Sequence, residues 1–244
     1  MQLFANNPYH GGVVVILEKL TQIRENIKNS IANRKNINMP DSVNLIAVTK
    51  NHDIYAMREA IDLGILQIGE NRVQEAMEKS KTLERNVEWN LIGHLQTNKV
   101  KQAVALFDII QSVDSEKLVL EINRVAGELN KIQDILIQVN VTQETSKFGI
   151  SSDDVITFAT FISKLTNVRL CGLMTIAPHY EDSESARPIF KELFQLFINL
   201  KDKNIKNTEI KWLSMGMTND YKVAIEEGAN VIRVGSGIFG QRQY

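Results

Sequence analysis

The strongest constraint on the fold of this chain is a regular alternation of short apolar runs with helical patterns. The runs that predict strands are residues 43–49, 65–69, 88–93, 108–113, 132–141, 168–176, 209–215 and 231–235. Most of them are apolar on both faces of the pleat, which is typical of strands buried between other strands and a layer of helices. Helical patterns lie between them at residues 53–63, 115–129, 183–203 and 219–227, and another precedes the first run at residues 13–33.

Eight such units in 244 residues favour one closed (β/α)8 TIM barrel over residues 1–244, with an extra N-terminal helix. An open flavodoxin-like or Rossmann sheet is the alternative, but no G-x-G-x-x-G motif follows the first strand. No linker or low-complexity segment divides the chain. Asp53, Ser115 and Ser151 are residue types that cap helices, and each precedes a helical pattern.

Charge and cysteine content exclude several classes of function. A formal net charge of −1 gives no electrostatic reason to expect a nucleic-acid or membrane partner. The single cysteine, Cys171, rules out a disulfide framework and is interpreted as a small buried hydrophobe. The N-terminus lacks the basic start and long apolar stretch of a signal peptide, so we expect a cytoplasmic protein. We expect no metal site, because metal-ligand spacing is absent among the histidines, which are His10, His52, His94 and His179.

Lys50 is the first candidate for chemistry, because it directly follows the apolar strand LIAVT (45–49). A charged ammonium in that position is costly unless it is paired or deprotonated, and burial lowers the pKa of a lysine. The neutral amine is the form that attacks a carbonyl group to make a Schiff base. A solvated lysine at the junction of strand and loop is the alternative, and position alone does not separate the two.

Several other predicted strands also end in polar residues. The sequences are GENR (69–72), LIGHLQTNK (91–99), QSVD (111–114) and QVNV (138–141). Barrel enzymes carry their chemistry at the C-terminal ends of the strands, so we expect these groups to converge on one face of the barrel. Each of them alone could be routine helix capping, as Asp114 and Ser115 are expected to be.

The last two predicted strands are followed by small residues that favour an anion site. LSMGMT (213–218) leads into a helix after the seventh strand, and VGSG (234–237) follows the eighth. Small residues let backbone N–H groups approach an anion, and barrels often bind phosphate between these two loops. Glycines needed only for tight turns are the alternative. Arg233, beside the second loop, needs an acceptor such as a ring nitrogen, a phosphate or a carboxylate if it points into the barrel mouth.

Taken together, these motifs resemble the pyridoxal phosphate homeostasis protein family. The resemblance is carried by AVTK around Lys50, GENRVQE (69–75), LIGHLQTNK (91–99), QSVDS (111–115), QVNVTQETSKFG (138–149), GLMTIAP (172–178), LSMGMTND (213–220) and IRVGSGIFGQR (232–242). These strings stand in order, at matching strand ends, over nearly the whole predicted barrel. One such string would be weak evidence for the family, whereas the full series in this order is highly specific for it.

The resemblance implies an alanine-racemase-like barrel of the type III fold that binds pyridoxal 5′-phosphate (PLP). Lys50 matches the lysine that holds PLP as a Schiff base. Arg233 matches the arginine that faces the pyridine nitrogen, and Asn71 matches an asparagine of the cofactor pocket. The phosphate-binding loops of the family fall on Ser214, Met215, Gly216, Met217, Gly235 and Ser236. Members of the family are generally monomeric, so a monomer is expected.

The sequence departs from the family pattern at three positions. Asn90 and Gln111 stand where many relatives have histidine, and Asp53 replaces a common proline after the lysine loop. None of the three matches a cofactor contact, so they concern peripheral features.

The arginine and the resemblance together favour a carrier over an enzyme. A positive charge against the ring nitrogen disfavours its protonation, which weakens the ring as an electron sink. Racemisation needs a second base, which in alanine racemases is a tyrosine from an additional domain, and this chain ends at Tyr244 directly after the barrel. We therefore hypothesise a protein that stores, buffers or delivers PLP, with apo PLP-dependent enzymes as its partners and with indirect effects on amino-acid and keto-acid pools.

Three other hypotheses stay open at this point. A PLP-dependent amino-acid racemase or a related small PLP enzyme is the main alternative. A phospho-sugar aldolase would keep the barrel and use Lys50 to form a Schiff base with its substrate. A purely structural role is the least favoured, because polar groups at strand ends have no reason to gather for stability alone.

Overall fold

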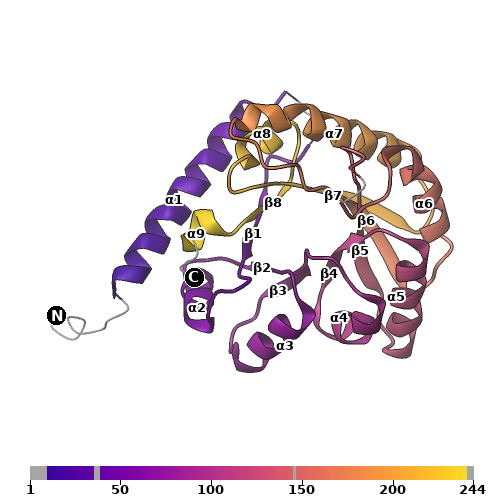
Figure 1. Cartoon of the computed structure of the whole chain (residues 1–244), viewed down its shortest axis with the longest axis horizontal. Helices are drawn as coiled ribbons and strands as arrows, with labels where there is room; N and C mark the ends of the chain where they lie inside the picture. Colours follow the sequence, from indigo (N-terminus) through magenta and orange to yellow (C-terminus); the bar gives the residue numbers. More distant parts are fainter. Residues whose placement is uncertain (1–9, 36–38, 145–146, 241–244) are drawn as a thin grey trace.

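Eight parallel strands close into a barrel in the computed structural model of the chain, which describes residues 10–35, 39–144 and 147–240. The strands follow one another around the barrel in chain order, and β1 pairs with both β2 and β8. They are β1 (Asn44–Val48), β2 (Gln67–Glu70), β3 (Glu88–Leu91), β4 (Ile109–Val113), β5 (Gln133–Gln138), β6 (Val168–Met174), β7 (Thr208–Met217) and β8 (Val231–Val234). The predicted (β/α)8 barrel is confirmed, and Figure 1 shows its strands inside a ring of helices.

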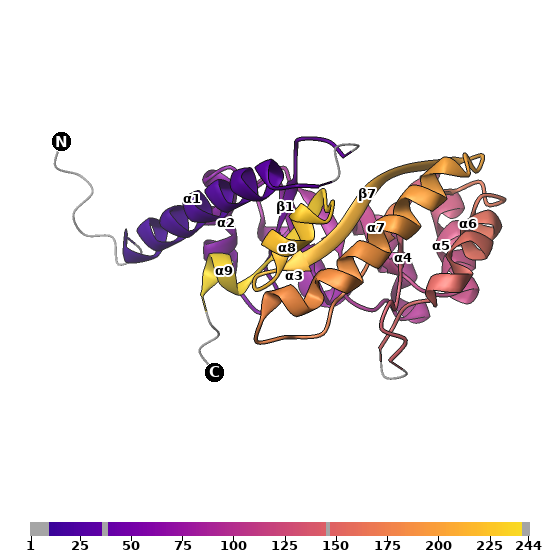
Figure 2. The same cartoon turned by 90° about the horizontal axis from the view of Figure 1, so that it is seen from above.

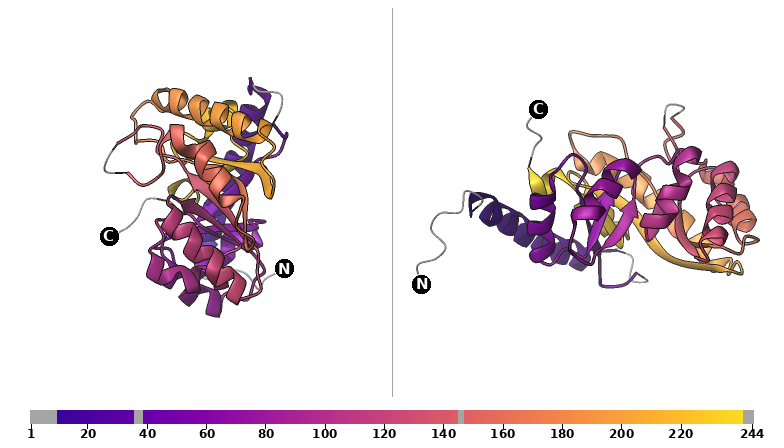
Figure 3. Two further views of the ribbon diagram at one scale, coloured as in Figure 1. Left: turned by 90° about the vertical axis from the view of Figure 1, so that its right-hand side faces the viewer. Right: turned by 90° about the horizontal axis from the view of Figure 1, so that it is seen from below.

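Helices cover the outside of the barrel. They are α1 (His10–Ala32), α2 (Ile54–Asp62), α3 (Val73–Thr82), α4 (Val100–Leu106), α5 (Glu116–Glu128), α6 (Val155–Ile162), α7 (Arg187–Asp202), α8 (Tyr221–Glu226) and α9 (Ser236–Phe239), with short 3₁₀ turns η1 (Thr97–Lys99), η2 (Ser152–Asp154) and η3 (Ser183–Ala186). The extra N-terminal helix α1 packs against α2, α8 and α9 (Figure 2). Figure 3 shows α1 and α9 at the same end of the molecule. Among the helices of the described ranges, none has the length and apolarity needed to cross a membrane.

Several predicted boundaries differ from the structure by a few residues, and two of these differences have a clear local reason. Strand β5 ends at Gln138 rather than at residue 141, because Val139 leaves the strand and bridges to Ile150. Helix α7 begins at Arg187 rather than at residue 183, because the preceding residues form the 3₁₀ turn η3.

Two of the three predicted caps make the expected hydrogen bond. The Asp53 carboxylate accepts from the backbone N–H of Ala56 at 2.9 Å and caps α2. The Ser151 hydroxyl accepts from the N–H of Asp154 at 3.3 Å, although it caps the 3₁₀ turn η2 rather than an α-helix. Ser115 occupies the N-cap position of α5, as predicted, but its side chain makes no cap hydrogen bond.

Two apolar regions form the core. The larger one lies between the strands and the helices, and its largest buried side chains include Phe107, Phe190 and Phe197. The smaller one is built from β4 to β7 and consists of Ile109, Leu136, Cys171 and Met174, with Trp212 packed against them. Burial raises the pKa of the Cys171 thiol to about 12, so the thiol stays protonated at neutral pH. Cys171 is therefore a buried hydrophobe, as the sequence predicts.

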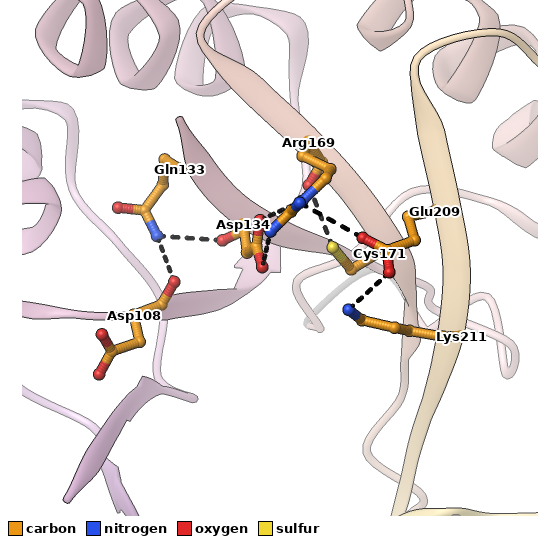
Figure 4. Close-up of polar contacts among 7 residues, drawn as sticks. All are labelled: Asp108, Gln133, Asp134, Arg169, Cys171, Glu209 and Lys211. Carbon is orange, nitrogen blue, oxygen red and sulfur yellow. Dashed lines mark hydrogen bonds and ion pairs between the residues drawn. The ribbon is translucent and has the colours of Figure 1, made fainter. Parts of the chain in front are cut away.

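Ion pairs join neighbouring strands at the N-terminal end of the barrel (Figure 4). Arg169 on β6 donates two hydrogen bonds to Asp134 on β5, at 2.7 and 2.9 Å. Arg169 also lies 3.4 Å from Glu209 on β7, and Glu209 accepts from Lys211 at 2.9 Å. Partly exposed ion pairs contribute little stability each, roughly 0–1 kcal/mol. This end of the barrel is the opposite one from the strand ends that carry the candidate residues, so the network supports strand register there.

A register shift in β6 brings the backbone of β7 unusually close. The pairing shifts between Ile135 and Leu136 on the β5 side and between Leu170 and Gly172 on the β7 side. Gly172 has a φ of +153°, and a Cβ atom there would lie 1.8 Å from the carbonyl oxygen of Trp212. Only glycine allows this approach, so Gly172 sets the register with which β6 and β7 reach the C-terminal end of the barrel.

We expect the substitution Gly172→Ala to lower the free energy of unfolding by more than about 3 kcal/mol, because backbone must move to admit the methyl group. Gly127→Ala is the matched control. A Cβ atom at Gly127, within α5, meets only the side-chain amide of Asn167, at 2.6 Å from its Nδ2 atom, and alanine favours a helix by about 1 kcal/mol. Urea denaturation measures both changes, and similar losses for the two variants would contradict the role given to Gly172.

Candidate functional site

A cavity of about 450 Å³ opens at the C-terminal ends of β1, β6, β7 and β8. Lys50 lines it from the β1 side, His179 from the segment after β6, Met217 from β7 and Gly235 from the end of β8. Because β8 pairs with β1 to close the barrel, segments from the two ends of the chain meet at this cavity. It therefore lies at the end of the barrel where enzymes of this architecture carry their chemistry.

The strand end of β1 presents Lys50 at the cavity wall. Thr49 is fully buried and Lys50 is half-buried, while Val48 and His52 line the same cavity on either side. Asn51 has a φ of +62°, so the chain turns into a left-handed conformation immediately after Lys50.

Arg233 is the buried cation of the site. It is only 3% exposed, and its guanidinium donates to Ser214 Oγ at 2.6 Å and to the carbonyl oxygen of Thr175 at 2.7 Å. Burial lowers the pKa of Arg233 to about 10, and the charge of Asp220 opposes that shift. The guanidinium therefore stays charged at neutral pH beside the cavity that it lines.

A line of hydrogen bonds leads from Arg233 into the interior of the barrel. Ser214 Oγ donates to Gln111 Oε1 at 2.6 Å, and Gln111 Nε2 donates to Asn90 Oδ1 at 2.8 Å. Asn90 Nδ2 then lies 3.3 Å from Glu88 Oε1, to which it donates. Every donor points away from the guanidinium and toward the carboxylate, so the charges at the two ends favour one direction of bonding. Asn90 and Gln111, where the sequence departs from the family pattern, are thus hydrogen-bonded to each other.

The loops after β7 and β8 are joined by a threonine. Thr218 Oγ1 accepts from the backbone N–H of Gly237 at 3.2 Å and from Ser236 Oγ at 3.3 Å. In the β7 loop, Asp220 Oδ1 accepts from the N–H of Met217 at 2.6 Å. These contacts hold the two predicted phosphate-binding loops beside each other on one wall of the cavity.

The structure divides the residues predicted for the cofactor site into two groups. Those that line the cavity are Lys50, Met217, Arg233, Gly235 and Ser236. Those that do not line it are Asn71, Ser214, Met215 and Gly216. The hydroxyl of Ser214 is already used by Arg233 and Gln111, and Met215 is fully buried. The side-chain oxygen of Asn71 is buried and has no hydrogen-bond partner within the described ranges.

Some cavity residues were missed by the sequence reasoning. His52 lies against Phe239, with ring centroids 4.6 Å apart and ring planes inclined by 33°, and the ring of His179 lies 3.2 Å from Asn219 Nδ2. His179 lies in the segment that follows β6, five residues after that strand ends at Met174, so a systematic reading of the segments after strand ends finds it. His52 has no such signal, because it becomes a wall residue only through the turn at Asn51.

The polar groups after β3 and β4 gather elsewhere on the same end of the barrel. His94 and Asp114 lie 3.4 Å apart and line a separate open cleft of about 360 Å³. His94 stacks on Phe148 at 3.7 Å between ring centroids. The expected convergence on one end of the barrel is found, but it produces two sites rather than one. Within the described residues, no three His, Cys, Asp or Glu side chains are grouped as a metal site requires.

The chemistry of the 450 Å³ cavity suits a small anionic ligand that carries a carbonyl group. Lys50 supplies an amine, Arg233 a cationic guanidinium, and Thr218 and Ser236 supply hydroxyls. Gly235 lacks a Cβ atom where one would lie 3.3 Å from the carbonyl oxygen of Val48, so the β8 loop comes close to the β1 wall beside Lys50. An amine, a buried guanidinium and a glycine loop in one cavity are the parts that a phosphorylated aldehyde such as PLP requires.

Comparisons with known proteins agree with this site. Residues 19–243 match the family model of the alanine racemase N-terminal domain. The chain is 40% identical to the pyridoxal phosphate homeostasis protein of Aquifex aeolicus over 201 residues, covering 82% of this chain and 87% of the relative. It is 34% identical to the protein of the same name from Escherichia coli K12, covering 94% and 97%. PipY of Synechococcus elongatus, solved with PLP bound, superposes with a TM-score of 0.80 at 36% identity, covering 92% of this chain and all of PipY.

We expect Ser214→Ala to lower the free energy of unfolding by about 1–3 kcal/mol, because it leaves a donor of buried Arg233 and the acceptor of Gln111 without their partner. Ser112→Ala is the matched control. Ser112 is equally buried, but its hydroxyl has no partner within the described ranges, so its loss should change the stability by less than about 0.5 kcal/mol. Chemical denaturation of both variants tests the hydrogen-bond line, and equal effects would refute it.

Proposed function

Because the chain belongs to the pyridoxal phosphate homeostasis protein family, whose barrel is the alanine racemase N-terminal domain, we propose that it binds PLP and stores, buffers or delivers the cofactor inside the cell. The single observation that carries the proposal is the cavity that brings together Lys50, buried Arg233 and the joined segments after β7 and β8. PLP bound to PipY, at 36% identity over the whole of that chain, supports the same ligand here.

In this proposal each group of cavity residues holds one part of PLP. Lys50 holds the aldehyde carbon covalently as a Schiff base, and Arg233 faces the pyridine nitrogen. Met217, Gly235 and Ser236 bind the phosphate, supported by the linkage through Thr218. The other residues predicted for the cofactor site do not line the cavity, so they would support the residues that do rather than contact PLP. They are Asn71, Ser214, Met215 and Gly216. Gly216, near the end of β7, lets that strand pack closely against α8, because a Cβ atom there would lie 2.6 Å from Ala224 Cβ.

The electrostatics of Arg233 favour a carrier. PLP supplies an aldehyde that captures primary amines and a ring that withdraws electrons, most strongly when its nitrogen is protonated. Arg233 keeps its own proton, because the pKa of about 10 lies well above neutral pH. The guanidinium has only donors and cannot accept a hydrogen bond from a protonated ring nitrogen. Its positive charge also disfavours a positive charge on that nitrogen. A site of this kind holds the cofactor and activates it poorly.

A PLP-dependent amino-acid racemase is the second candidate, and one observation favours it. Racemisation needs a base on the opposite side of the substrate from Lys50, and His179 and Tyr180 line the same cavity. His179 lies against Asn219, which could orient its ring. The carrier is preferred because the relatives are named as homeostasis proteins and because of the charge on Arg233.

The proposal also includes the setting of this role. We infer a monomeric, cytoplasmic protein whose partners are apo PLP-dependent enzymes. The near-neutral net charge and single buried cysteine of the chain support a reducing compartment without a polyanionic partner. Sedimentation of the purified protein tests the monomer directly.

The carrier and the racemase differ in what the PLP-loaded protein does. We expect the loaded protein to restore an apo PLP-dependent enzyme in proportion to the PLP that it carries, because Lys50 releases what it has captured. We expect it to exchange the α-proton of common amino acids with deuterium no faster than free PLP does. Enzyme assay and proton NMR measure the two effects. Fast exchange without transfer would make the protein a racemase, and Lys50→Ala serves as the control that should lose the transfer.

A further inference from the structure

A cluster of buried charges lies against the backbone next to Lys50, and none of its residues lines the cavity. Lys79 on α3 donates all three of its ammonium hydrogens: to the carbonyl oxygen of Thr49 at 2.7 Å, to Glu70 Oε1 at 2.8 Å and to Glu75 Oε1 at 2.7 Å. The Lys79 side chain is 11% exposed and the Glu70 side chain is 0% exposed. The ammonium is therefore fully paired and nearly removed from water.

This cluster binds the backbone on both sides of Lys50. On the N-terminal side, the carbonyl oxygen of Thr49 accepts from Lys79, and Thr49 Oγ1 donates to Glu70 at 2.5 Å. On the C-terminal side, the backbone N–H of Asn51 donates to Glu75 Oε1 at 2.6 Å. Because Asn51 adopts a φ of +62°, which costs energy for a residue other than glycine, this bond also supports the turn that follows Lys50.

Stability alone gives little reason for such a cluster. A buried ion pair costs desolvation, and apolar residues of similar volume are often as stable. Glu70 Oε2 is buried without a hydrogen-bond partner within the described ranges, which adds a further cost. Burial raises the pKa of Glu70, although Lys79 and Thr49 oppose the shift. Burial also acts to raise the pKa of Glu75, but the hydrogen bonds from Lys79 and Asn51 outweigh it and lower that pKa.

We propose that Lys79, Glu70 and Glu75 form a positioning cluster that fixes the backbone around Lys50 and so controls how fast its amine reacts with carbonyl compounds. The inference rests on the proposed function only in naming PLP as that compound. In the reaction the amine nitrogen replaces the carbonyl oxygen, which leaves as water with two protons. The cluster holds the neighbours of Lys50 through the carbonyl oxygen and hydroxyl of Thr49 and the backbone N–H of Asn51, and its contribution is to keep the amine in one orientation toward the cavity.

Glu75 offers the sharpest test, because its side chain is 21% exposed and its removal leaves Glu70 and Lys79 paired. We expect Glu75→Ala to slow the covalent attachment of PLP to Lys50 by roughly tenfold. Glu75→Gln should recover most of this rate, because its amide oxygen still accepts from Asn51 N–H. Lys81→Met, an exposed lysine on the same helix, is the matched control and should keep the wild-type rate. Stopped-flow absorbance measures attachment.

A second readout separates this inference from the proposed function. Competitive acetylation of the PLP-free protein, followed by mass spectrometry, gives the reactivity of Lys50 relative to exposed Lys101 in the same molecule. We expect Glu75→Ala to lower this ratio by a similar factor. If acetylation depends on Glu75 while the wild type never takes up PLP, the positioning cluster stands and the proposed function fails.

Two results would overturn the inference. One is a folded Glu75→Ala variant, with the thermal midpoint of the wild type, whose Lys50 reacts as fast as in the wild type. The other needs no variant and applies even if Glu75→Ala does not fold. The Asn51 amide, in an exposed residue, should be protected from hydrogen exchange in the wild type by its bond to Glu75, and exchange at the unprotected rate would show that the cluster does not hold this turn.

Discussion

The pairing of β1 with β8 is the constraint on which the site depends. In this pairing Ile46 lies opposite Arg233 and Ala47 opposite Val234, so the strand that leads to Lys50 lies beside the strand that carries the arginine. Parallel strands share one direction, and their C-terminal ends therefore open at the same face of the barrel. Residues from the two ends of the chain meet in one cavity without any long loop. The register at Gly172 completes the arrangement, since it brings Thr175 and Ser214 to where they accept from Arg233.

The site is surrounded by polar groups that the protein buries at a cost. On the β8 side, the buried Arg233 guanidinium donates to Ser214, and a line of hydrogen bonds continues from Ser214 through Gln111 and Asn90 to Glu88. On the β1 side, Lys79 and two carboxylates hold the backbone around Lys50. Apolar residues of similar volume are often as stable as buried charges, so we explain both arrangements by the orientation that they give to Arg233 and Lys50.

The fold was predictable because barrel strands are buried on both faces and therefore stand out as apolar runs. Lys50 and Arg233 were predictable as polar residues at the ends of such runs, and both line the cavity. The sequence does not predict whether a residue near the end of a strand points into the barrel interior or into the cavity. Nothing in LSMGMT tells that Ser214 points to Arg233 while Met217 reaches the cavity, because a bulge in the β7–β8 pairing decides it. The role of Lys79 and Glu75 could not be predicted from the sequence, because an i, i+4 pair on a helix has the pattern of an ordinary surface ion pair.

The central claim is that Lys50 of this barrel captures PLP, and borohydride trapping tests it most directly. The purified protein is incubated with PLP, reduced, digested and analysed by mass spectrometry, with the visible absorption recorded before and after reduction. The account predicts a yellow protein that borohydride bleaches, with the added mass on the peptide that contains Lys50 and no such colour in Lys50→Ala. A wild type that stays colourless with PLP, or a label on other lysines alone, would contradict it. Either result would favour the alternative of a barrel aldolase that forms a Schiff base with its substrate.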